Sequence, residues 1–192
     1  MGLYRDDGIV LRTHKLGEAD RIVSVLTRGR GKVRAVAKGV RKTKSRFGAR
    51  LEPPTHLQLQ LYEGRELDIV TQAETLDHFR AIREDLDRLT RAVSMLEAAD
   101  QLSLEGEANP ALYQMLLGAL RALAGHSGPL VVPAFYLKVL ALEGYRPTVD
   151  VCIECGAADD LVAFDLDSGG MRCTAHRAGA AISGDALALL RD

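Results

Sequence analysis

Four residues toward the C-terminal end have the types and spacing of a metal site. Cys152 and Cys155 form one C-x-x-C pair, and after 17 intervening residues Cys173 and His176 form a second pair. Three thiolates and one imidazole suit zinc, which they would enclose in a tetrahedron. Because a closed set leaves no position for water, the spacing predicts one structural zinc ion and no catalytic metal. The alternative is three free cysteines and an incidental histidine.

The segment around these ligands should be a compact element spanning residues 150–180. Gly156 follows the first pair, where a left-handed backbone lets N–H groups face the thiolates. A hairpin is expected between the pairs, with strands at residues 161–164 and 171–173 and a turn at 167–170. The hairpin would bring the two pairs together.

A second chemically distinctive segment is basic. Residues 1–50 contain 14 of the 25 lysines and arginines but only 4 of the 26 acidic residues. A phosphate backbone would relieve the repulsion among such closely spaced cations, because their binding releases condensed counterions. The predicted DNA-binding residues are Arg28, Arg30, Lys32, Arg34, Lys38, Arg41, Lys42, Lys44, Arg46 and Arg50. The alternatives are a mobile, solvated loop, or charges that only keep the chain in solution.

Enzymatic motifs are missing from the sequence. Residues 39–45 resemble a phosphate-binding loop but lack the G-x-x-x-x-G-K-[ST] spacing, and neither G-x-S-x-G nor H-E-x-x-H occurs. The other histidines have no paired carboxylates or nucleophile nearby in the sequence. We therefore predict a binding protein and no catalytic residues. Aromatic residues are sparse, so charge should dominate binding, although Tyr62 should face outward and could stack on a base.

The elements that must position these groups change along the chain. Five short strands are expected at residues 8–13, 21–27, 33–38, 57–61 and 67–72, where apolar and polar residues alternate between turns. Five antiparallel strands in about 70 residues are typical of a small closed barrel of the OB type. The predicted barrel domain spans residues 1–76.

Helical periodicity replaces this alternation after the barrel. Phe79, Ile82, Leu86, Leu89, Val93 and Leu96 are predicted to form one apolar stripe on a long helix. Asn109 and Pro110 should begin a second helix, and Pro133 a third that stops at Gly144. The predicted fold class is α+β: an N-terminal five-stranded OB-type barrel, then an all-α domain at residues 77–192 with an inserted zinc-binding hairpin.

Three stretches resemble the RecO family of bacterial recombinational repair mediators. They are YRDDGIVLRTHKLGEADRIVSVLTRGRGKVRAVAKGVRKTKSRFGARLEP, then LQLYEGRELDIVTQAE, then ALEGYRPTVDVCIECG before the metal ligands. The resemblance implies that the barrel binds single- and double-stranded DNA and that complementary strands are annealed. It also implies partnership with RecR, contact with the C-terminal tail of single-strand-binding protein (SSB), and indirect action on RecA, which is loaded on SSB-coated DNA.

The sequence departs from the family pattern at two places. His176 stands where the family commonly has cysteine, so metal affinity should fall at acidic pH, where imidazole is protonated. Family members also usually continue beyond the zinc element, so the helical part is expected to be shortened at its C-terminal end. No signal peptide or membrane span is expected, which predicts a cytoplasmic, nucleoid-associated protein. Alternatives left open are an RNA-binding OB and zinc protein, a zinc hydrolase acting on nucleic acid, and a protein-only adaptor.

Overall fold

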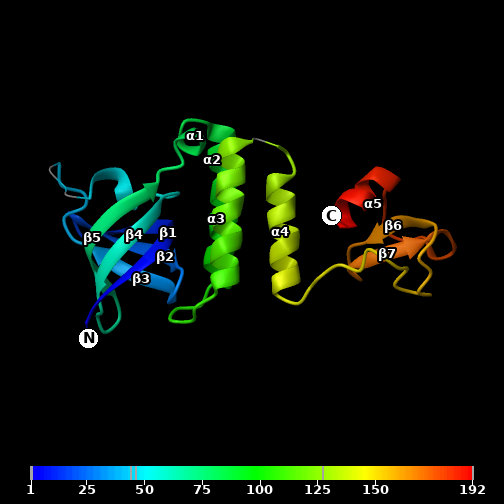
Figure 1. Ribbon diagram of the computed structural model, residues 1–192, viewed down its shortest axis with the longest axis horizontal. Helices are drawn as coiled ribbons and strands as arrows, with labels where there is room; N and C mark the ends of the chain where they lie inside the picture. Colours follow the sequence, from blue (N-terminus) through cyan, green and yellow to red (C-terminus); the bar gives the residue numbers. More distant parts are fainter. Residues whose placement is uncertain (1, 44, 46, 127, 192) are drawn as a thin grey trace. The chain divides into compact units, whose positions relative to one another are not determined.

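A computed structural model describes residues 2–43, 45, 47–126 and 128–191. The chain divides into two compact units, Met1–Tyr136 and Leu137–Asp192. Figure 1 shows strands at the start of the chain, helices in its middle and a second small sheet near its end. No helix among the described residues is long and apolar enough to cross a membrane.

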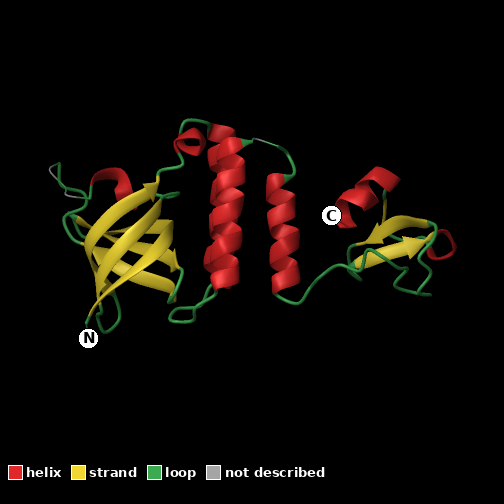
Figure 2. Ribbon diagram, in the orientation of Figure 1, coloured by secondary structure: helices red, strands yellow, loops and turns green. Residues whose placement is uncertain are grey.

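The first unit begins with a closed five-stranded barrel, which confirms the predicted fold class. Its strands are β1 (Leu3–Leu16), β2 (Asp20–Thr27), β3 (Gly31–Ala37), β4 (His56–Tyr62) and β5 (Asp68–Asp77). The order around the barrel is β1-β2-β3-β5-β4, and only the β3–β5 pairing is parallel. Figure 2 shows the strands wrapping around one another in this barrel.

Alternation along the strands fills the barrel with aliphatic side chains. Val23 and Val25 on β2, and Leu57, Leu59 and Leu61 on β4, all point inward and are at most 1% exposed. The short helix η1 (Gly48–Leu51) contributes Leu51 to the same core, and Phe47 just before it is also buried there. The positions between these residues are polar: Gln58 and Gln60 on β4 lie on the outer face, as a period of two requires, whereas Ser24 on β2 is buried.

Helices α1 (Arg80–Arg83), α2 (Leu86–Leu102) and α3 (Pro110–Gly125) follow the barrel. The prediction of one long helix from Phe79 to Leu96 is wrong, because Asp85 interrupts it as an N-cap that accepts bonds from the N–H groups of Asp87 and Arg88. Leu86 and Val93 are consequently exposed, and α2 buries Ala92, Met95, Leu96, Ala99 and Asp100. The predicted start of α3 is confirmed: Asn109 caps the N–H of Leu112 at 2.9 Å.

The helical part docks on the barrel in two ways. Helix α2 packs against β1 and β2. The loop between α2 and α3 also pairs with the start of β3, where the Lys32 N–H donates to the Leu104 carbonyl at 3.1 Å. Gly31 permits this approach, since a Cβ at this position would lie 1.9 Å from the Glu107 carbonyl oxygen.

Helix α4 (Val131–Leu142) lies across the boundary between the units. The second unit then contains β6 (Leu161–Asp165), β7 (Gly170–Cys173), η2 (Thr174–His176), β8 (Ala180–Ala181) and α5 (Gly184–Arg191). Strand order is β7-β6-β8, and the predicted hairpin is the β6–β7 pair. Val149, Met171 and Leu187 form a small buried core in this unit.

A buried histidine at the barrel–helix contact makes stability depend on pH. His56 is 5% exposed, and its Nε2 lies 2.7 Å from the Tyr113 hydroxyl on α3. Burial lowers the pKa of His56, although the facing carboxylates of Asp7 and Asp77 oppose that shift. A histidine whose folded-state pKa is depressed stabilises the fold above the unfolded pKa of about 6.5 and loses that contribution as the pH falls below it.

We therefore expect the wild-type chain to lose up to about 1 kcal/mol more stability than His56→Gln when the pH is lowered from 7.5 to 5.5. Urea denaturation at both pH values measures the two losses. Subtracting the loss of the variant from that of the wild type removes the contribution of the other titrating groups, which the two proteins share. Equal losses in the two proteins would contradict the prediction.

Candidate metal centre and basic barrel surface

The four predicted metal ligands converge in the second unit. The ligand atoms of Cys152, Cys155, Cys173 and His176 all lie within 4.8 Å of one another. The Cys155 and Cys173 sulfurs are 3.8 Å apart, and the Cys173 sulfur lies 3.4 Å from His176 Nδ1. A tetrahedral ion with metal–sulfur bonds of about 2.3 Å separates two sulfurs by roughly 3.8 Å. The cluster can therefore hold one metal ion.

Backbone geometry presents these ligands. Gly156 has the left-handed φ of +76° expected from the sequence, and its N–H donates to the Cys152 carbonyl at 2.8 Å to close the first knuckle. The second pair lies where β7 ends and η2 begins. Arg172 joins the knuckles, since it reaches Glu154 at 2.7 Å and Asp165 at 2.9 Å. The ion pair between Arg172 and Glu154 thus ties the first ligand pair to the hairpin, and the second pair begins at the end of β7.

Local hydrogen bonds favour the deprotonated form, which metals need, in two of the three thiols, whereas burial and the neighbouring Cys152 and Cys173 sulfurs raise the pKa of Cys155. Backbone hydrogen bonding at Cys173 lowers the pKa of Cys152 to about 6. A hydrogen bond with His176 lowers the pKa of Cys173 as well. Thiolates, not thiols, bind metal ions. The donor set therefore suits a soft or borderline cation.

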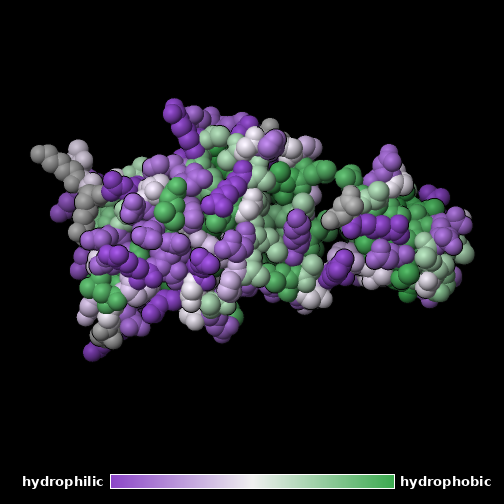
Figure 3. All heavy atoms as spheres, viewed as in Figure 1, coloured by the Kyte–Doolittle hydropathy of each residue, from purple (hydrophilic) through white to green (hydrophobic). Residues whose placement is uncertain are grey.

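The predicted basic residues separate into two groups on the barrel. Arg28 and Arg30 lie in the β2–β3 turn, and Lys32 and Arg34 lie on β3. Lys38, Arg41 and Lys42 follow the opposite end of β3, and Arg50 lies in η1. Seven residues of strand separate the two ends by about 20 Å. Lys44 and Arg46 lie outside the described residues. Figure 3 shows hydrophilic side chains over much of the barrel face in view.

The group at the start of β3 is partly neutralised within the chain. Lys32 is 15% exposed and lies 3.4 Å from the buried Asp100 carboxylate, which Arg12 also contacts at 2.9 Å. Arg34 pairs with Glu105 at 3.5 Å. Arg30 lies over the Tyr4 ring at 3.9 Å and reaches Glu63 at 4.0 Å. Charge counting in residues 1–50 could not reveal these partners, because Asp100 and Glu105 are distant in the sequence.

The cations that follow the other end of β3 are less neutralised by carboxylates of the chain than those at its start. Over the part of the chain that the structure describes, Lys38, Arg41 and Lys42 have no carboxylate within ion-pair distance. The Arg41 N–H and guanidinium donate to carbonyls of Ala19 and Gly17, which holds this loop against the β1–β2 turn. The structure therefore presents the Lys38–Lys42 loop as the stronger candidate for contact with a polyanion.

Barrel, helices and Cys3His knuckle together define a modular binding protein of the OB-barrel class, a fold that commonly binds oligonucleotides. Residues 1–79 match the family described as "Recombination protein O N terminal", and residues 83–191 match "Recombination protein O C terminal". The chain belongs to the RecO family of DNA repair proteins.

Curated relatives named "DNA repair protein RecO" cover nearly the whole chain. The protein of a Nocardioides species is 54% identical over 183 residues, which are 91% of this chain and 75% of that protein. The Thermobifida fusca protein is 50% identical over 182 residues, or 92% of this chain and 74% of that protein. The Frankia casuarinae protein is 49% identical over 200 aligned positions, which cover all of this chain and 82% of that protein.

Proposed function

We propose that this chain binds single- and double-stranded DNA through the barrel and anneals complementary strands. The observation that carries the proposal is the Lys38–Lys42 loop, whose cations have no carboxylate partners among the described residues. Two complementary strands repel each other along their phosphates. A basic surface that holds both lowers this repulsion and leaves the base edges able to pair. No covalent step is required, and the protein acts as a mediator without enzymatic activity.

The partners follow from the family. We propose that the chain acts with RecR, contacts the C-terminal tail of SSB, and helps RecA to load on SSB-coated DNA in the cytoplasm. A DNA-repair role of the named relatives supports this assignment. Reconstitution of RecA loading on SSB-coated single strands, with and without RecR, tests it.

We further propose that the metal is zinc and that its role is structural. All four ligands come from the protein, so the site retains no position for water or substrate. When bound, zinc supplies a crosslink between the two knuckles. Cys152 and Cys155 fix the chain before the hairpin, and Cys173 and His176 fix the chain after it.

The annealing proposal predicts a specific change in salt dependence. Replacing Lys38 and Lys42 with glutamine should make the slope of log K against log salt less negative by about 1.8 on duplex DNA, since each lost phosphate contact contributes about 0.9. Strand annealing should slow in parallel. Fluorescence anisotropy at several salt concentrations and a strand-annealing assay measure the two effects.

A matched control changes Lys138 and Arg146, two cations outside the barrel, to glutamine. This variant should keep the wild-type slope. An unchanged slope in the Lys38 and Lys42 variant, or an equal change in the control, would remove the loop from the DNA-binding surface.

A further inference from the structure

A belt of apolar side chains runs around the outside of the barrel. Cross-strand pairing places Leu3 of β1 beside Tyr62 of β4, and Tyr62 beside Ile69 of β5. The parallel pairing continues the belt from Ile69 to Val36 of β3. Leu3 is 59% and Tyr62 is 41% exposed, whereas Ile69 and Val36 are partly buried. The belt therefore offers an accessible aromatic ring with aliphatic neighbours on both sides.

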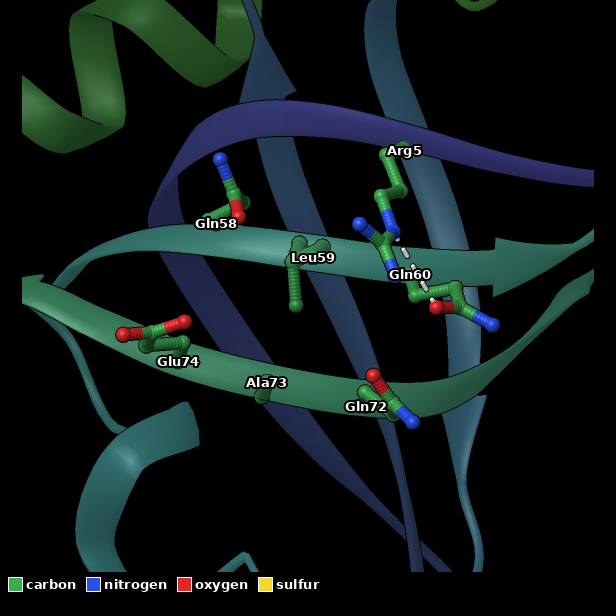
Figure 4. A pocket seen from close by; sticks show the side chains of 7 residues that line it. All are labelled: Arg5, Gln58, Leu59, Gln60, Gln72, Ala73 and Glu74. Carbon is green, nitrogen blue, oxygen red and sulfur yellow. Dashed lines mark hydrogen bonds between the residues drawn. The ribbon is translucent and has the colours of Figure 1, made fainter.

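A hollow of about 320 Å³ lies beside this belt on the outer faces of β1, β4 and β5. Figure 4 shows Gln58 and Gln60 on one strand and Gln72 on the next, with Arg5 above them. Arg5 Nε donates to Gln60 Oε1 at 3.2 Å, which leaves the amide NH₂ of Gln60 as a donor for another molecule. Primary amides and a guanidinium are the groups that hydrogen-bond to the edges of nucleobases.

Charge around the face is arranged unevenly. Arg34 precedes Val36 by two residues along β3, so it lies on the same outer face as the belt, and Lys38 follows in the turn just beyond the strand. Arg5 occupies the equivalent flank beside Leu3. At the far end of the hollow lies Glu74, paired across the strands with Gln58. Phosphates would be attracted to the Arg5 flank and, less strongly because Glu105 pairs with Arg34, to the β3 flank, and they would be repelled from the Glu74 end.

We propose that this outer face is a binding site for the unpaired bases of a single strand, with Tyr62 as its stacking platform and the three glutamines as contacts to base edges. The inference rests on the proposed DNA-binding function and adds a division of labour to it. The Lys38–Lys42 loop attracts phosphates of either form of DNA, whereas Tyr62 can stack only on a base that is not already paired. The charge pattern favours an oligonucleotide over an apolar peptide, because cations border the belt on two strands.

The absence of tryptophan from the sequence permits a direct test. In Tyr62→Trp, the new indole is the only tryptophan, and its emission should fall when oligo(dT) is added. It should change little with a blunt duplex of equal length. Tyr145→Trp, in which the replaced tyrosine is 75% exposed and lies outside the barrel, is the matched control and should not respond to either DNA.

Affinity gives a second readout. Tyr62→Ala should weaken single-strand binding by about 5- to 160-fold, the range for loss of one stacked base, and should change duplex binding by less than about 2-fold. Tyr62→Phe should retain wild-type affinity. Equal loss for both forms of DNA, full affinity in Tyr62→Ala, or an indole emission in Tyr62→Trp that does not respond to oligo(dT) would overturn the base-binding site while leaving the proposed function intact. Failure of the wild-type chain to bind any DNA would instead remove the proposed function.

Discussion

Replacing Cys173 with alanine is expected to release the metal and unfold the second unit while the barrel remains folded. The buried core of this unit consists of Val149, Met171 and Leu187 with a few partly buried neighbours, which is too little apolar surface to stabilise a unit of this size alone. Structural zinc sites in small elements contribute roughly 10 kcal/mol or more of apparent binding free energy at neutral pH. Loss of one ligand should therefore have the largest effect of any single substitution in this unit.

Metal content by mass spectrometry under native conditions and limited proteolysis measure this outcome. Proteolysis should cut Cys173→Ala within residues 150–180 and spare the barrel. Ala175→Ser, a change at an exposed position between two ligands, should retain metal and resist cleavage. If Cys173→Ala keeps one equivalent of zinc and melts as the wild type does, the zinc site is not structural.

Replacing Asp100 with alanine should destabilise the first unit by about 3 kcal/mol. The Asp100 side chain is 5% exposed, and its carboxylate forms ion pairs with both Arg12 and Lys32. The Lys32 ammonium also donates to the Asp100 carbonyl at 2.7 Å. Removal of the carboxylate leaves the Lys32 charge mostly buried without its partner, and the cost of an uncompensated buried charge exceeds the attraction that a surface pair provides.

Urea denaturation measures the loss, and two further variants separate its causes. Glu105→Ala breaks the exposed pair with Arg34 and should cost less than about 1 kcal/mol. Asp100→Leu combined with Lys32→Met removes both buried charges together and should recover most of the stability. A loss in Asp100→Ala no larger than that in Glu105→Ala would show that the buried cluster does not hold the helices on the barrel.

Local patterns in the sequence predicted most elements of the fold. Alternation at Leu57, Leu59 and Leu61 predicted a strand, and the structure confirms that all three point inward. Prediction from apolar spacing failed at Leu86 and Val93. Both continue the helical spacing of three and four residues between apolar positions, but both are exposed. The capping side chain of Asp85 restarts the helix there, so the buried face shifts to Met95 and Ala99. Periodicity cannot anticipate a phase change that a single polar side chain imposes.

The two sites differed in how far sequence could define them. Short spacing and distinctive side-chain chemistry define the metal ligands, because each pair occupies one knuckle and a hairpin joins them. The basic surface depends on long-range pairing. Lys32 is an expected phosphate ligand by local charge, yet it meets Asp100, 68 residues away in the sequence. Arg5 and the glutamines of the β4–β5 face carry no motif, and only strand register places them together.

The pairing between the α2–α3 loop and β3 has a consequence for how the first unit opens. The Lys32 N–H donates to the Leu104 carbonyl, and Gly106 N lies 3.4 Å from Lys32 O, so opening of the loop breaks main-chain hydrogen bonds made by β3. Slow amide hydrogen exchange at Lys32 should therefore track the protection of α2 amides, with barrel and helices behaving as one cooperative foldon.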